Sequence, residues 1–311
     1  MEGNLTQIAT ESFDSEFGIA ARWARFRRSR LVCEWTRSPV GMAGTIMVAI
    51  VLLAALVAPV VSPHDPTQHH RDIRFLPPMW SAEGRAAFPL GTDQLGRDVL
   101  SRLLVGSRIS VLVGVTSVVI GGTIGAVLGI SAGYWGGFVD LVVSRFIDAF
   151  LAVPFIVLVL ALVGVLGPSL LTIIIVLGTT GWASYARVVR GEVLSLKERE
   201  FVLAAKALGA SEIRIAVRHV LPNTFASIIV LATLSVASTI LAEASLSYLG
   251  LGVQPPTVTW GLMISNGRQY LSSAWWLATF PGVSIMITVL GVIFLGDWLR
   301  DVLDPRLKGA E

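Results

Sequence analysis

The apolar positions of this 311-residue chain gather into long runs that contain no Asp, Glu, Lys or Arg. These runs cover residues 38–64, 109–139, 149–186, 219–242, 244–267 and 269–296. Each run is long enough to hold a membrane-spanning helix of about 20 residues. Run 149–186 is too long for one helix and has Gly164, Gly167, Pro168 and Ser169 at its middle. It therefore predicts two spans joined by a tight turn.

Run 244–267 differs from the others because Gly250, Gly252, Pro255 and Pro256 break it early. Its first residues are expected to end the preceding span, and the rest to form a loop. The pattern thus predicts about six transmembrane helices, at roughly 40–61, 107–131, 142–166, 169–189, 224–249 and 277–297. The expected fold class is an all-α polytopic membrane protein.

The approach to the second span has its own pattern. The stretch GTDQLGRDVLSRLLVGSRISV at 91–111 predicts an amphipathic helix that leads into the span, with Asp93 as a candidate cap. Within the span, Gly121, Gly125 and Gly129 recur every four residues and therefore share one helix face. Small residues at this spacing predict close packing against a neighbouring helix.

The composition agrees with a membrane location, and the placement of the basic residues indicates the orientation. Only 14% of the residues are charged, against about 25% in soluble domains. Basic residues concentrate in the N-terminal tail, around residues 187–218 and in the C-terminal tail. The positive-inside rule then predicts cytoplasmic tails at 1–38 and 301–311 and a cytoplasmic loop at 190–222. Between the tails we expect a first span at 39–62, an external loop and amphipathic helix at 63–106, and a core domain at 107–300 that contains the cytoplasmic loop.

Two further features narrow the partners. The sequence pI near 9.3 is explained by cytoplasmic anchoring, and because no basic patch is interleaved with aromatic residues, no nucleic-acid partner is expected. Cys33 is the single cysteine, which excludes an intramolecular disulfide.

The cytoplasmic loop contains EFVLAAKALGASEIRIAVRHVLPN at 200–223. Its first half predicts a helix that ends near Leu208, with Gly209 in a left-handed turn. A second short helix is expected to start at Ser211 and to stop at Pro222. Two such amphipathic helices could lie on the lipid surface or dock in a groove of a partner protein.

Residues 203–222, LAAKALGASEIRIAVRHVLP, resemble the cytoplasmic EAA loop of ATP-binding-cassette importer permeases. The family pattern is Glu-Ala-Ala, three residues, Gly, nine residues, an apolar position, one residue and Leu-Pro. The residues that carry this site are Ala204, Ala205, Gly209, Ala210, His219, Leu221 and Pro222. Two positions depart from the pattern, because Leu203 stands where Glu is usual and His219 replaces the apolar residue.

Three other stretches extend the resemblance. GTDQLGRDVLSRLLVGSRIS at 91–110, RFIDAFLAVPFIVL at 145–158 and ILAEASLSYLGLGVQPPTVTWG at 240–261 resemble the C-type permease subunit of dipeptide and oligopeptide importers. The resemblance implies a type I importer permease fold with cytoplasmic coupling helices, in a bacterial or archaeal plasma membrane. It also implies a homologous second permease, two cytoplasmic subunits that bind ATP and Mg, and an extracytoplasmic peptide-binding protein.

The chain itself is expected to bind no cofactor and to be a transport subunit, not an enzyme. It has no GxxxxGK[ST] phosphate loop, no HExxH and no GxSxG motif. An ion-coupled secondary transporter remains an alternative of a different class, but it should need paired intramembrane carboxylates. Glu243 alone supports that alternative.

Three groups of polar residues have competing interpretations. Glu243 could contact the transport path, or it could form structural hydrogen bonds near the outer end of its span. Asp148 and Arg145, near the start of the third span, could pair locally or reach the membrane interface, and we expect a structural role for them. The histidines of the external loop, His64, His69 and His70, could bind nickel in a metal-chelate permease of the same branch. They lack the framework of a defined site, so we expect a solvated loop and no bound metal.

Overall fold

The computed structural model describes residues 30–303, so most of the two predicted tails lies outside the described part of the chain. All regular elements within that part are helical. They are α2 (Arg30–Arg37), α3 (Pro39–Val61), η1 (Arg71–Ile73), α4 (Val99–Trp135), α5 (Gly137–Ala152), α6 (Phe155–Leu166), α7 (Leu170–Leu196), α8 (Glu200–Ala207), α9 (Glu212–Ile215), the π-helical η2 (Ala216–Val220), α10 (Leu221–Tyr248), α11 (Trp260–Gly267), η3 (Arg268–Tyr270) and α12 (Trp276–Leu303).

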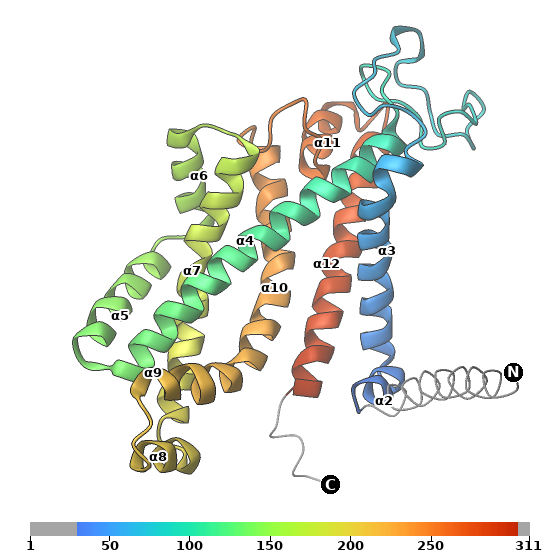
Figure 1. The fold of residues 1–311 in the computed structure, drawn as a ribbon. Coiled ribbons are helices and arrows are strands. Elements are labelled where there is room, and N and C mark those ends of the chain that lie inside the picture. The colour runs from blue at the N-terminus through green and yellow to red at the C-terminus, as the bar shows by residue number, and fades with distance from the viewer. Residues whose placement is uncertain (1–29, 304–311) are drawn as a thin grey trace, which may run out of the picture.

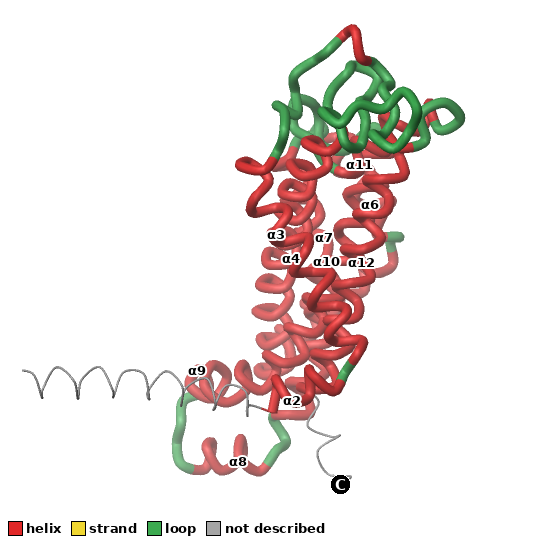
Figure 2. Tube along the Cα trace, turned by 90° about the vertical axis from the view of Figure 1, so that its right-hand side faces the viewer, coloured by secondary structure: helices red, strands yellow, loops and turns green. Residues whose placement is uncertain are grey.

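The long helices form an upright bundle with two distinct ends (Figure 1). Among the described residues, five helices are long and apolar enough to cross a membrane, and the bent pair α5 and α6 would make a sixth span. This confirms the expected all-α polytopic fold. Figures 1 and 2 place α2, α8, α9 and the end of α12 at one end, which we call the α8 end. The loop over residues 62–98 and α11 lie at the opposite end, the α11 end.

The glycine stripe of α4 packs against α7, as its spacing predicts. A Cβ atom added to Gly121 would lie 2.8 Å from the carbonyl oxygen of Gly178. One added to Gly129 would lie 2.8 Å from the carbonyl oxygen of Ala186 and 2.9 Å from Cβ of Val189. Only glycine lets the two backbones approach this closely.

The start of α4 differs from the prediction. Residues 91–98 of the predicted amphipathic helix form a turn, and the rest of that stretch joins the second span in one helix of 37 residues, about 55 Å long at 1.5 Å per residue. Such a helix is longer than the hydrocarbon core, and α4 runs obliquely through the bundle (Figure 1). Its cap is Asp98, whose carboxylate accepts hydrogen bonds from the backbone N–H groups of Leu100 and Ser101. Asp93 closes the preceding turn instead, where it accepts from Arg97.

The third predicted span is broken. Helices α5 and α6 meet at an angle of 89°. The break lies at Pro154, which has no N–H for the helix and forces Val153 into an extended conformation with φ −91° and ψ 129°. The prediction of one continuous helix at 142–166 is therefore wrong.

Two more differences follow from local geometry. Pro222 does not end the helix, because it directly follows the π-helical turn Ala216–Val220, and a local π turn accommodates a proline in a helix that continues. As a result, α9, the π-helical turn and α10 run on from Glu212 to Tyr248. After α10, the expected loop contains α11, which Thr259 caps by accepting a hydrogen bond from the N–H of Leu262.

Candidate functional site

The turn after α8 is a hydrogen-bonded helix end of the Schellman type. The N–H of Gly209 donates to the carbonyl of Lys206 at 3.0 Å, and the N–H of Ala210 donates to the carbonyl of Ala205 at 3.1 Å. Gly209 has a φ of +78°, in the left-handed region that favours glycine. The spacing of Ala205, Gly209 and Ala210 is thus explained by one turn, and the predicted left-handed conformation is confirmed.

One side of this loop, residues 197–222, is packed onto the bundle. Val202, Ile215 and Val220 are buried together with Val189 and Val193 of α7. Around this cluster, the half-buried residues are Ile130, Tyr134, Leu196, Ala205, Ala210 and Ile228. The loop is therefore held against the ends of α4 and α7, and a force on the loop acts on these helices directly.

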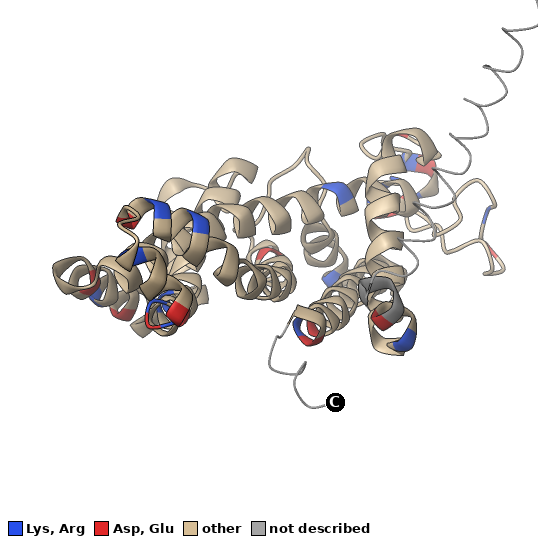
Figure 3. Cartoon of the chain, turned by 60° about the horizontal axis from the view of Figure 1, so that its bottom comes forward, with Lys and Arg blue, Asp and Glu red and all other residues tan. Residues whose placement is uncertain are grey.

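The other side of the loop is exposed and apolar, with charged residues around it. Leu208 is 87% exposed and Ile213 is 68% exposed, and Leu203 and Val217 are also exposed. In Figure 3, which brings the α8 end forward, basic and acidic segments gather in this region. An apolar patch with a charged rim is typical of a surface that binds another protein.

The remaining motif residues lie where the loop enters α10. His219 is half-buried with its ring centroid 6.5 Å from that of Phe201, and its carbonyl accepts a hydrogen bond from Asn223. Leu221 is half-buried, whereas Pro222 and Ala204 are exposed.

Two ion pairs connect α5 to the part of α7 that leads into the loop. Arg190 binds both carboxylate oxygens of Asp140, with its Nη2 at 2.7 Å from Oδ2. Arg187 binds Asp148 at 2.8 Å, and both side chains are more than half exposed. Asp148 therefore pairs with Arg187 of α7 and not with Arg145, the local partner that the sequence suggests.

Glu243 lies in α10 near the α11 end and is 1% exposed. Its Oε1 atom accepts hydrogen bonds from the hydroxyl groups of Ser247 at 2.8 Å and Thr259 at 2.9 Å. Its Oε2 atom is also buried and has no hydrogen-bond partner among the described residues. This carboxyl group connects two segments of the chain.

The histidines of the 62–98 loop contribute to its packing. The ring of His64 stacks on Phe88 with centroids 4.5 Å apart, and His70 contacts the same ring edge-on at 5.9 Å. The Nδ1 atom of His64 lies 3.4 Å from Asp98, while His69 is exposed. Within residues 30–303, no group of three or more His, Cys, Asp or Glu side chains is arranged to hold a metal ion.

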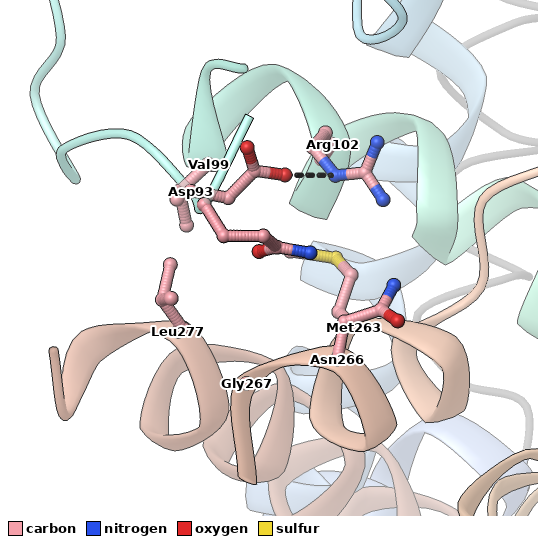
Figure 4. A pocket seen from close by; sticks show the side chains of 8 residues that line it. Asp93, Val99, Arg102, Met263, Asn266, Gly267 and Leu277 are labelled. Atoms are coloured by element: carbon pink, nitrogen blue, oxygen red, sulfur yellow. Dashed lines mark ion pairs between the residues drawn. The ribbon is translucent and has the colours of Figure 1, made fainter. Parts of the chain in front are cut away.

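A small pocket below this loop joins α4, α11 and α12 (Figure 4). It is lined by Asp93, Gln94, Val99, Arg102, Met263, Asn266, Gly267 and Leu277. With about 10 Å³ open to the centre of a water molecule, it has room for about one water and not for a peptide. The buried guanidinium of Arg102 lies 3.5 Å from Asp93 and donates to the carbonyl of Pro66. The pocket therefore lies where the 62–98 loop, α4, α11 and α12 meet.

Comparison with known families identifies the class of protein. The model for the binding-protein-dependent transport system inner membrane component matches residues 125–309, which contain the loop and Glu243. The chain belongs to this family. A second model, for the N-terminal transmembrane domain of oligopeptide transport permease C, matches residues 34–78. The chain is therefore a multi-pass permease subunit of a transport system, as its sequence predicts.

Relatives cover nearly the whole permease. The di/tripeptide transport system permease protein DppC of Pseudomonas aeruginosa is 43% identical over 86% of this chain and 89% of its own length. The dipeptide transport system permease protein DppC of Haemophilus influenzae is 40% identical over 86% and 90%. The probable D,D-dipeptide transport system permease protein DdpC of Escherichia coli is 38% identical over 92% and 94%.

Sequence reasoning missed several polar residues of the permease. Thr259 and Ser247 bind Glu243, but small hydroxyl residues in an apolar run look like ordinary helix residues. Arg102 is buried although it lies among the scattered arginines of the predicted external segment. The Asp98-Val99 step was a usable signal, because an acidic residue directly before an apolar helix is a common cap.

Proposed function

We propose that this permease is the transmembrane subunit of an ATP-driven importer for dipeptides or short oligopeptides. Membership of the transport family and the names of the relatives support this substrate class. A homologous second permease would complete the translocation path, and an extracytoplasmic peptide-binding protein would deliver the peptide. The N- and C-termini would face the cytoplasm of a bacterial or archaeal cell, in the inner membrane.

The observation that carries the mechanism is the two-sided loop at the α8 end. Its buried side is fixed to α4 and α7, and its exposed side presents Leu203, Leu208, Ile213 and Val217. In the proposed complex, one of two cytoplasmic ATP-binding subunits takes this exposed side into a groove. Closure of the ATP-binding pair then moves the loop, and the packed side passes the movement to the transmembrane helices.

The permease contributes mechanical contacts, and the chemistry takes place in its partners. ATP and Mg would bind to the ATP-binding subunits, whose hydrolysis of ATP supplies the energy. The chain would need no cofactor of its own. The residues proposed to carry the coupling are Ala204, Ala205, Gly209 and Ala210, which lie in α8 and the turn after it, and His219, Leu221 and Pro222, which lie where the loop enters α10.

The test is purification of the tagged permease in mild detergent with its co-expressed partners, followed by an ATPase assay. Co-purification of a second permease and ATP-binding subunits is expected, together with hydrolysis that a peptide-loaded binding protein stimulates. A permease that purifies alone, under conditions in which a related complex stays intact, would contradict the proposal. Uptake that persists on an ion gradient after ATP depletion would instead indicate a secondary transporter.

A further inference from the structure

The helix that leaves the coupling loop reaches the opposite end of the permease. From Glu212 the chain stays helical through the π-helical turn and α10 as far as Tyr248. Figure 1 shows this helix crossing the α8 end and then rising to the α11 end. Its rising part, α10, has 28 residues and is therefore about 42 Å long. A movement of the loop is thus carried along one continuous helix to Glu243.

At that end, Glu243 connects α10 to the start of α11. The hydroxyl group of Thr259 donates its single proton to Oε1 of Glu243 and accepts a hydrogen bond from the N–H of Leu262. Both hydrogen bonds fix the same oxygen atom of Thr259, so the carboxyl group holds the residue that caps α11. The second donor to Oε1, Ser247, belongs to α10 itself and adds no connection between segments.

The start of α11 is also fixed in space by its neighbours. The N–H of Trp260 donates to the hydroxyl group of Ser110 in α4, and its indole N–H donates to the carbonyl of Leu103 at 3.0 Å. A Cβ atom added to Gly261 would lie 2.7 Å from Cα of Ala244 and 2.8 Å from Cβ of Ser247. The first turn of α11 is therefore wedged between α10 and α4.

Packing alone does not explain a glutamate at this position. A Met or Leu side chain would occupy a similar volume without the cost of burying a carboxyl group in a membrane domain. What the carboxyl group adds is a directional bond to Thr259. A buried hydrogen-bonded group of this kind fixes one arrangement of two elements, whereas apolar contacts allow sliding.

We propose that Glu243 is a positioning residue that fastens α11 to α10, so that the segment at residues 249–270 follows α10 when the coupling loop moves. The inference rests on the proposed function, because it takes the loop as the point where force enters. It assigns to Glu243 a place in the conformational cycle and no contact with the peptide. In this proposal, a movement that starts at α8 ends at residues 249–270.

The experiment uses the complete complex in lipid nanodiscs and four variants of the permease. Glu243→Met and Thr259→Val each remove the bond between the segments, and their combination tests whether the two residues act through each other. Ser247→Ala is the matched control, because it removes a hydrogen bond to the same oxygen within α10. Glu243→Gln keeps an oxygen acceptor in place and should rescue the loss.

Two quantities are measured for each variant: amide hydrogen exchange in residues 259–267, and ATPase stimulation by the peptide-loaded binding protein. Glu243→Met and Thr259→Val should speed exchange in α11 about ten-fold, the effect of one lost hydrogen bond to a buried carboxyl group. They should also lower the stimulation several-fold, while basal ATPase activity and exchange in α8 stay unchanged. Because Thr259→Val also removes the cap of α11, the double variant should be no worse than Thr259→Val. Glu243→Gln and Ser247→Ala should stay within about two-fold of the wild type.

The proposal is wrong if Glu243→Met matches Ser247→Ala in both measurements, or if the effects of the double variant simply add. Should Glu243→Met fail to assemble, Glu243→Leu against Ser247→Ala decides the question. A wild-type complex without stimulated ATPase activity would contradict the proposed function, and the exchange measurement would still test the connection between α10 and α11.

Discussion

Replacement of Gly209 by valine tests the coupling turn most directly. Gly209 adopts a φ of +78°, and no atom lies within 4 Å of the position that a Cβ would take. The substitution therefore causes no clash, and its whole cost comes from the backbone. Holding an L-residue in the left-handed region costs roughly 1–2 kcal/mol, and the β-branched valine belongs at the upper limit. A local cost of about 2 kcal/mol lowers the population of the native turn about 30-fold relative to open forms.

The assay compares ATPase stimulation, peptide uptake and membrane level of the assembled complex. Gly209→Val should insert normally, because Gly209 itself is exposed and lies outside the packed cluster, but stimulation and uptake should fall several-fold. Gly209→Asn should recover most of the activity, because Asn tolerates the left-handed region. Gly191→Ala in α7 is the control: it also has open space around it but an ordinary helical backbone, so it should be neutral or slightly stabilising. Full stimulation and uptake by the Gly209→Val complex would refute the idea that this turn transmits force.

Three further predictions address the bundle, the ion pairs and the external loop. Gly125→Ala should destabilise the α4–α7 contact by about 2 kcal/mol or more, seen as a lower melting temperature, because its Cβ would strike Tyr185 and the carbonyl of Trp182; Gly181→Ala, with open space around it, should not. Asp140→Asn should raise amide exchange in α5 clearly more than Asp148→Asn, because the two-point, partly buried pair is the stronger one; equal effects would contradict this ranking. Calorimetric titration with nickel should give the same weak heats before and after alanine replacement of the three loop histidines.

The sequence predicted those parts of the fold that depend on long-range averages. Runs without charge located the spans, and the glycine spacing in α4 predicted close packing against a neighbouring helix, because a four-residue period is a property of the helix alone. That the neighbour is α7 comes from the structure. The ordered match at 91–110, 145–158, 203–222 and 240–261 identified the family, which the comparisons confirm. The roles of the coupling-loop residues stay predictions.

The errors arose where one residue has two possible effects. Pro154 breaks a helix, whereas the helix continues through Pro222, although both prolines lie in apolar segments. The difference is the π-helical turn directly before Pro222, which accommodates the missing N–H. Asp93 is the cap that the sequence analysis predicts, but Asp98 directly precedes the apolar helix and caps it. Asp93 is instead held by Arg97 and Arg102. The bond from Glu243 to Thr259 spans a turn whose path the sequence did not specify.

The right-angled break between α5 and α6 restricts what can surround the permease at that point. The last carbonyl groups of α5 have no N–H ahead of them in the helix, and Pro154 offers none. Hydrocarbon chains cannot satisfy such groups, and each one left unsatisfied in them costs several kcal/mol. Yet Leu151, Val153 and Phe155 are exposed around the break in the isolated chain. Acyl chains alone are therefore unsuited to cover the surface around the bend. Water or another polypeptide is needed against that part of the permease.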